Sequence, residues 1–268
     1  MKATLWIAVN VFRESVRDKV LYNLVVFAIL MMGASYLIGQ LTAGQDIKII
    51  KDLGLTAISV FGLFIAVFIG IQLVSKEVER RSIYSMLAKP IHRHQLVLGK
   101  YLGLALTLAV NLAIMALAFY AVLGYMRWTS PQLVLDSLEG PATDPRMLKA
   151  IVLIYGQLAI VTAVALFFSS FSTPILSASF TLGIYVAGHF STDLRNFDQV
   201  IDSRAAQTVA RGMYWILPNL APFDVKAQVV HALHVPAGYV ALTLLYGAAY
   251  VAVLLTMAVM IFSRRDFR

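Results

Sequence analysis

The sequence predicts an all-α, polytopic membrane protein with six transmembrane helices and an interfacial amphipathic helix at its N-terminus. Hydrophobic residues make up 60% of the 268 positions and charged residues 13%, and the mean hydropathy is +0.78. A soluble domain is much less apolar. Several apolar runs approach the ~20 residues that a helix needs to cross the ~30 Å hydrocarbon core of a bilayer. We therefore expect one transmembrane domain over residues 1–268.

The first helix of this plan is amphipathic. Apolar residues recur at steps of three and four at positions 5, 9, 12, 16 and 20, and charged residues occupy the opposite face at positions 13, 14, 17 and 18. Trp6 lies near its start. This pattern is typical of a helix that lies along a membrane surface. The alternative is an ordinary polar flank of the first span.

Six apolar ranges are predicted to cross the membrane: 21–41, 53–74, 96–123, 148–168, 174–191 and 236–262. The fourth and fifth should form a tight hairpin, because the connection 169–174 offers hydroxyl caps and then Pro174 for a first helical turn. Between the last two spans, the extracytoplasmic segment 193–235 carries helical periodicity broken by Pro218 and Pro222. We expect one or two helices there, lying on or dipping into the membrane surface.

The charge distribution predicts the orientation. An even number of spans places both termini on one side, together with residues 75–101. That side holds 13 of the 22 basic residues and 5 of the 14 acidic residues, an excess of +8, whereas the other side holds nine of each. The positive-inside rule assigns the basic side to the cytoplasm. We expect a multi-pass protein of the cytoplasmic (inner) membrane with both termini cytoplasmic, and the net charge requires no nucleic-acid partner.

The cytoplasmic segment 75–95 between the second and third spans presents both charge and an apolar ridge. Glu77 and Arg81 are spaced to pair across one helical turn. Pro90 ends such a helix. The ridge on the same helix comes from three apolar residues at helical spacing, namely Ile83, Met86 and Leu87.

This segment closely resembles the permeases of ATP-binding cassette exporters of the type-2 class, in the branch for maturation of multi-copper enzymes and nitrous oxide reductase. The motif is Glu77…Arg80-Arg81-Ser82-Ile83-Tyr84…Leu87-Ala88-Lys89-Pro90-Ile91…Arg93, followed by Gly99-Lys100-Tyr101-Leu102-Gly103. In such permeases a coupling helix at this place docks on a separate ATPase subunit. The resemblance therefore implies that Glu77, Arg81, Ile83, Met86, Leu87 and Pro90 couple this chain to an ATPase, which binds ATP and Mg²⁺, and that a second copy or a sister permease completes the pathway.

The chain itself carries no signature of an ATPase. Gly99-Lys100 is followed by Tyr101 and lacks the upstream glycine of a phosphate-binding loop. The cores of the predicted spans contain no Asp, Glu, Lys or Arg, which disfavours a proton- or sodium-driven carrier. We expect a transport subunit that is not an enzyme and has no cofactor of its own.

Four neutral polar residues lie in the predicted spans: Gln72, Asn111, Gln157 and His189. They either hydrogen-bond between helices or line the transport pathway. Outside the spans, His231 and His234 lack a firm third ligand, so we expect no metal site. Gly99 and Gly103 permit close helix packing, either within one subunit or between two.

These observations favour the permease subunit of an ATP-binding cassette exporter. The competing interpretation is a non-transporting membrane anchor or a mechanotransmission module of a protein complex. Such a module would be expected to carry a large extracytoplasmic domain, which this chain lacks. The resemblance allows a sulfur-containing or metal-related precursor as substrate, although the same architecture elsewhere moves drugs, peptides, lipids and glycans.

Overall fold

The computed structural model describes residues 2–40, 46–79, 92–129, 141–191, 212 and 217–264, and within these ranges the chain forms helices and turns without a strand. The longer helices are α1 (Lys2–Val16), α2 (Lys19–Gln40), α3 (Asp46–Glu79), α5 (Arg93–Thr129), α7 (Arg146–Ser169), α8 (Pro174–His189) and α12 (Ala237–Arg264). Two short helices, η2 (Ala221–Phe223) and α11 (Lys226–Val230), lie between α8 and α12. The prediction of an all-α membrane protein is confirmed.

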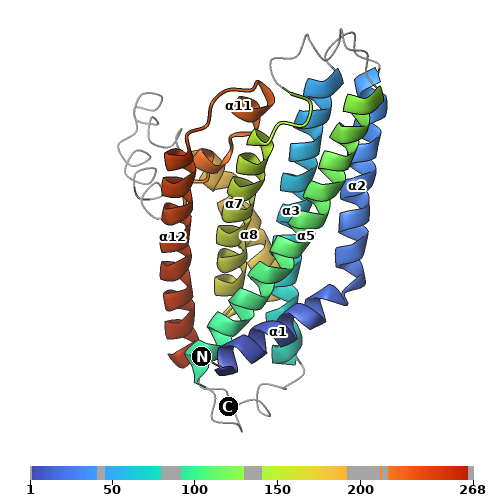
Figure 1. Ribbon diagram of the computed structural model, residues 1–268. Coiled ribbons are helices and arrows are strands. Elements are labelled where there is room, and N and C mark those ends of the chain that lie inside the picture. The colour runs from blue at the N-terminus through green and yellow to red at the C-terminus, as the bar shows by residue number, and fades with distance from the viewer. Residues whose placement is uncertain are drawn as a thin grey trace.

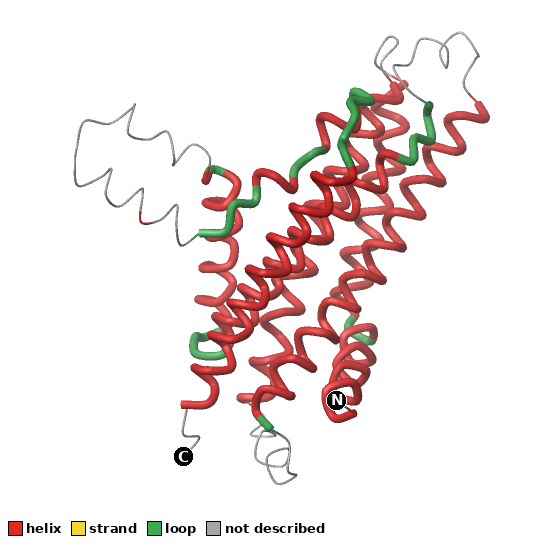
Figure 2. Tube along the Cα trace, turned by 60° about the vertical axis from the view of Figure 1, so that its left-hand side comes forward, coloured by secondary structure: helices red, strands yellow, loops and turns green. Residues whose placement is uncertain are grey.

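The long helices form an up-and-down bundle with two distinct ends. Helix α1 lies obliquely across one end, which also holds the last turn of α12, and α11 lies at the opposite end (Figure 1). The view turned by 60° again shows the first residues of α1 and the end of α12 at the same end of the bundle, although they lie apart from one another there (Figure 2). We call these the α1 end and the cap end; the cap end holds residues 141–145 and the cap segment, residues 217–235.

Among the described residues, five helices are long and apolar enough to cross a membrane, over residues 19–39, 47–71, 94–129, 146–169 and 237–262. Helices α3 and α7 are the most buried of the five, and α2 and α12 the least. Helix α3, with 34 residues, is about 51 Å long at 1.5 Å per residue. It is longer than the predicted span 53–74 because hydropathy detects only the part of a helix at lipid depth.

Helix α8 is two residues shorter than the fifth predicted span, 174–191. It has 16 residues, which gives about 24 Å, less than the ~30 Å hydrocarbon core. The helix ends where the cap segment meets it: the backbone N–H of Leu220 donates to the Gly188 carbonyl at 3.0 Å, and the Ser191 hydroxyl donates to Asn219 Oδ1 at 2.8 Å. The chain therefore completes this side of the bundle with the cap segment.

The hairpin between α7 and α8 is tight, as predicted, and Pro174 occupies the first turn of α8. The hydroxyl groups of the connection were predicted to cap the start of α8, but Thr173 makes no side-chain hydrogen bond to that helix. Instead Ser169 and Ser170 donate back to carbonyl oxygens of the last turn of α7, at 2.9 and 2.6 Å. These bonds satisfy acceptors that a helix C-terminus leaves free.

Helix α1 is amphipathic, and small residues form the face that packs on the bundle. Its buried face is formed by Ala8, Val11 and Ser15 and packs on α5. Of the predicted stripe, Leu5 is 61% exposed and Val9 is exposed as well, and the neighbouring Trp6 is 74% exposed. Exposed apolar side chains on a helix across the end of a membrane bundle fit an interfacial position.

Candidate functional site

The predicted coupling segment connects the end of α3 to the start of α5 at the α1 end. Glu77 belongs to the last turns of α3. The other proposed coupling residues lie outside the described residues, namely Arg81, Ile83, Met86, Leu87 and Pro90. The side chains of Glu77 and Gln72 lie outside them as well. At the start of α5, the rings of His92 and His94 stack with their centroids 5.4 Å apart.

Helix α1 crosses α5 at two glycines, directly after this connection. A Cβ at Gly99 would lie 2.8 Å from Ile7 Cβ and 2.9 Å from the Thr4 carbonyl oxygen. A Cβ at Gly103 would lie 2.6 Å from the Ala8 carbonyl oxygen. Real Cβ atoms do not approach other atoms so closely, so glycine is required at both positions. The two glycines thus serve packing within one subunit.

Two polar residues predicted in the spans meet between α7 and α8. Gln157 Nε2 lies 2.8 Å from His189 Nε2, and His189 Nδ1 lies 2.9 Å from the Tyr185 carbonyl oxygen. A carbonyl only accepts, so Nδ1 carries the proton and Nε2 accepts a hydrogen bond from the Gln157 amide. Gln157 is buried, and the pair lies close to the cap segment at the end of α8.

Asn111 is also buried, and its Nδ2 donates to the Thr107 carbonyl of its own helix at 2.7 Å. Two tyrosines connect neighbouring helices near it. The Tyr101 hydroxyl donates to the Ala159 carbonyl, and the Tyr155 hydroxyl donates to the Ala105 carbonyl, each at 3.3 Å. These two bonds join α5 to α7 in opposite directions.

The cap segment inserts an aromatic anchor into the bundle. Phe223 is fully buried, and its ring lies against two glycines: Cβ atoms at Gly156 and Gly247 would come within 3.1 Å of it. The turn before it is held at Asn219, whose Oδ1 accepts the N–H of Ala221 at 3.2 Å. The small residues of α7 and α12 therefore provide the space in which η2 packs.

Helix α11 ends in a Schellman motif. The N–H of Ala232 donates to the Val229 carbonyl at 3.1 Å and that of Leu233 donates to the Gln228 carbonyl at 2.8 Å. Ala232 has a φ of 54°, the left-handed conformation for which glycine is usual. Contacts from α7 help to hold this turn.

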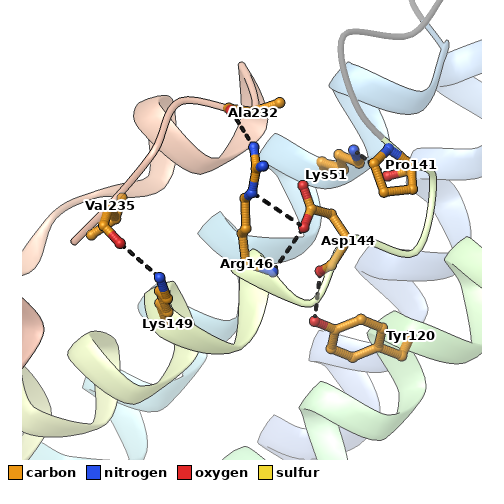
Figure 3. A network of polar contacts seen from close by, with 8 residues as sticks. All are labelled: Lys51, Tyr120, Pro141, Asp144, Arg146, Lys149, Ala232 and Val235. Atoms are coloured by element: carbon orange, nitrogen blue, oxygen red, sulfur yellow. Dashed lines mark hydrogen bonds and ion pairs between the residues drawn. The ribbon is translucent and has the colours of Figure 1, made fainter. Parts of the chain in front are cut away.

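Those contacts come from two basic residues at the start of α7, which reach the carbonyl groups that follow α11 (Figure 3). Arg146 Nη1 donates to the Ala232 carbonyl. Lys149 Nζ donates to the Val235 carbonyl at 2.7 Å. Two charge-assisted hydrogen bonds thus attach the cap segment to α7.

A buried acid–base cluster lies beside them (Figure 3). Lys51 of α3 is 3% exposed, and its Nζ donates to the Pro141 carbonyl at 3.0 Å. Asp144 is 2% exposed; its Oδ1 accepts the Arg146 N–H at 2.8 Å, and its carbonyl accepts the Tyr120 hydroxyl at 3.1 Å. The cluster joins α3, α5 and α7 at the cap end.

Sequence reasoning missed this cluster because it placed Lys51 and Asp144 in extracytoplasmic loops, beyond the predicted spans. The available signal was the Asp144-Pro145 pair, which is typical of a helix start. Lys100, counted among the cytoplasmic charges, is likewise buried within α5. These buried lysines lie toward the ends of their helices, so the cores of the spans carry no charged residue, as predicted.

His231 and His234 lie in the last five residues of the cap segment. Within the described ranges no group of three or more His, Cys, Asp or Glu residues is arranged to hold a metal ion. In the described part of the chain, polar side chains link the helices, the cap segment packs on the bundle and α1 packs on α5. These are structural contacts within a membrane bundle.

The comparison with known families decides the assignment. The chain matches the model of the family described as "ABC-2 family transporter protein" over residues 5–267. It belongs to the ABC-2 transporter family. No curated protein matches the chain.

Members of the ABC-2 transporter family are membrane subunits of ABC transporters, which work with an ATPase subunit. The assignment agrees with the multi-pass helical bundle and favours transport over the anchor or mechanotransmission alternative. It makes this ABC-2 chain a membrane permease subunit that partners with an ATPase subunit.

Proposed function

We propose that this chain is the permease subunit of an ABC exporter. Two copies, or one copy and a sister permease, form the pathway, and a separate ATPase subunit binds ATP and Mg²⁺. Membership of the ABC-2 family supports the permease role. The observation that carries the coupling mechanism is the contact of α1 with α5 at Gly99 and Gly103, directly after the segment that resembles a coupling helix.

Coupling follows from the position of this contact. ATP-driven association of the ATPase subunits displaces the segment 75–95, which connects α3 to α5. Because α1 packs on the first turns of α5, α1 and α5 move together. A displacement at the membrane surface thus becomes a movement of α5 in the bundle, as in other rigid-body transitions.

In this mechanism the chain lies in the inner membrane with its α1 end in the cytoplasm. The excess of basic residues on that side supports it. The cap end then faces outward, and the packed cap segment closes the pathway from outside until the bundle rearranges. The bonds of Arg146 and Lys149 to the cap segment are contacts that such a rearrangement can break and re-form.

The proposal extends to the chemical class of the substrate. The resemblance to the maturation branch favours a sulfur-containing or metal-related precursor for an extracytoplasmic enzyme. Gln157 and His189 form a partly buried polar contact close to the cap segment, and a pathway that opened between α7 and α8 would expose them to substrate.

The test uses charge placed on the proposed apolar ridge. Met86→Asp puts a carboxylate where an ATPase contact would bury it, and losing such an anchor costs about 2 kcal/mol or more. We expect normal membrane insertion, weakened co-purification of the ATPase and loss of transport. Ser85→Asp adds the same charge to the opposite face of the predicted helix, and Arg93→Ala removes a charge near the lipid headgroups. Both controls should retain association.

Co-purification and transport are measured for all three variants at matched expression. Full ATPase association and activity of Met86→Asp would place the ridge against lipid or its own subunit and refute the coupling assignment. Equal losses in Ser85→Asp would mean that charge anywhere on the segment is harmful, which also contradicts a specific ridge.

A further inference from the structure

An apolar groove of about 430 Å³ lies between α5 and α7. Its lining on α5 includes the small residues Ala109, Ala113 and Ala116, and its lining on α7 includes Leu148 and Val152. All of these residues lie in helices that can cross the membrane. The groove therefore opens at lipid depth, where water is not available to fill it.

The groove offers no free hydrogen-bonding group. Its two polar lining residues are Tyr120 and Tyr155. The Tyr120 hydroxyl donates to the Asp144 carbonyl, and the Tyr155 hydroxyl donates to the Ala105 carbonyl. Since both donors are already used inside the protein, the surface favours a hydrocarbon over a polar ligand.

The shape of the groove matches one leaflet. From Ala109 to Tyr120 it follows α5 for about 16 Å at 1.5 Å per residue, which is about half of the ~30 Å hydrocarbon core. Figure 1 shows α12 near α5 at the α1 end and far from it at the cap end, with α7 between them. The lining comes from α5 and α7, so α12 leaves the groove open.

Cations and aromatic rings lie beyond the cap end of the groove. Arg127, near the end of α5, donates to the Thr143 hydroxyl and remains exposed. Arg146, at the start of α7, has a side chain that is 43% exposed. Trp128 is 86% exposed, as is typical of residues at a membrane interface. Each guanidinium group keeps N–H donors beyond those that bond Thr143 and Ala232, so each can bind a phosphate at this level.

We propose that this groove is a binding site for a phospholipid of the leaflet at the cap end, with an acyl chain between α5 and α7 and its phosphate near Arg127 and Arg146. The site is independent of the transported substrate and of the orientation of the chain. A bound acyl chain fills the groove between α5 and α7 while the two helices keep their positions. The lipid then packs as a part of the folded subunit.

The experiment maps lipid contacts by photocrosslinking. The intact chain is reconstituted in vesicles of phosphatidylcholine and phosphatidylglycerol that contain a trace of phospholipid with a diazirine in its acyl chain. After irradiation, peptide mass spectrometry locates the adducts. We expect groove residues to carry about fivefold more adducts than Leu242 and Leu245 of α12, which are 69% and 67% exposed to ordinary lipid.

Two variants test occupancy. Ala113→Trp fills the groove and should lower adducts there about fivefold. Ala248→Trp, at an exposed position of α12, should leave them unchanged. Equal adduct density on the groove and on α12 would show only bulk lipid and overturn the proposal. If Ala113→Trp does not fold, the wild-type map alone decides the question.

A second copy of the chain is the other possible occupant. The chain contains no cysteine, so a single Leu117→Cys, at an exposed position beside the groove, reports on contact between copies. Ready disulfide formation between copies at this position, with no lipid adducts in the groove, would replace the lipid by a subunit interface and overturn the proposal.

Discussion

Replacing Gly103 by alanine should loosen α1 from α5, whereas the same replacement at Gly124 should not. The new Cβ at position 103 would lie 2.6 Å from the Ala8 carbonyl oxygen and from Val11 Cγ1, against an ordinary contact of at least 3.4 Å. The obstacle includes backbone, so α1 itself must shift by several tenths of an ångström. At Gly124, in the same helix, nothing lies within 4 Å of the added atom.

The magnitude follows from comparing the two variants. Alanine favours a helix over glycine by about 0.8–1.0 kcal/mol at either position, so this contribution cancels in the comparison. Overpacking at Gly103 should cost about 1–3 kcal/mol. Since 1.4 kcal/mol is a factor of about ten, transient separation of α1 should become about 5 to 150 times more frequent in Gly103→Ala than in Gly124→Ala.

The assay measures this separation directly. Ser15 is 4% exposed on the buried face of α1, and the chain has no native cysteine. The rate at which a maleimide labels Ser15→Cys therefore reports how often α1 leaves α5. Equal labelling rates in the two alanine backgrounds would refute the packing argument and, with it, the proposed joint movement of α1 and α5.

Three further outcomes are expected. Cysteines introduced singly at Ser82 and Ser137 should label oppositely with an impermeant thiol reagent on intact cells, Ser137→Cys from outside; the reverse pattern would overturn the orientation. The purified chain should show no ATP hydrolysis, and robust turnover free of contaminating ATPases would contradict the division of labour. Phe223→Ala should destabilise the purified protein by about 3–5 kcal/mol in a thermal or denaturant series, whereas Phe64→Ala, at a side chain that is 38% exposed, should cost much less; similar losses would mean that Phe223 is no anchor.

Hydropathy alone was sufficient to predict the bundle, because an uninterrupted apolar run at lipid depth has few alternatives to a helix. The length of α8 was not predictable in this way. Its apolar run continues into Phe190, and only the contact of Gly188 with the cap segment shows where the helix gives way to a turn. A one-dimensional pattern does not contain that contact.

The sequence predicted which residues take part in the candidate site better than it predicted which residues they contact. The spacing of Gly99 and Gly103 indicated a close contact, but the partner of that contact came from the path of α1. The apolar stripe of α1 that begins at Leu5 indicated a helix on the membrane surface, but the stripe did not show that the small residues of α1 pack on α5; in a membrane subunit large apolar side chains can face lipid while small ones face the protein. The buried Lys51 was missed because helices continue beyond their most apolar part.

The paired bonds of Tyr101 and Tyr155 limit how the bundle can deform. Each hydroxyl reaches a backbone carbonyl of the other helix, so sliding α5 along α7 by one turn, about 5.4 Å, would break both bonds at once. The two helices should therefore behave as one rigid body during the transport cycle. The other movements of the bundle should then involve α2 and α12, which are the least buried of its membrane-spanning helices. These two helices can tilt against lipid or another subunit without separating α5 from α7.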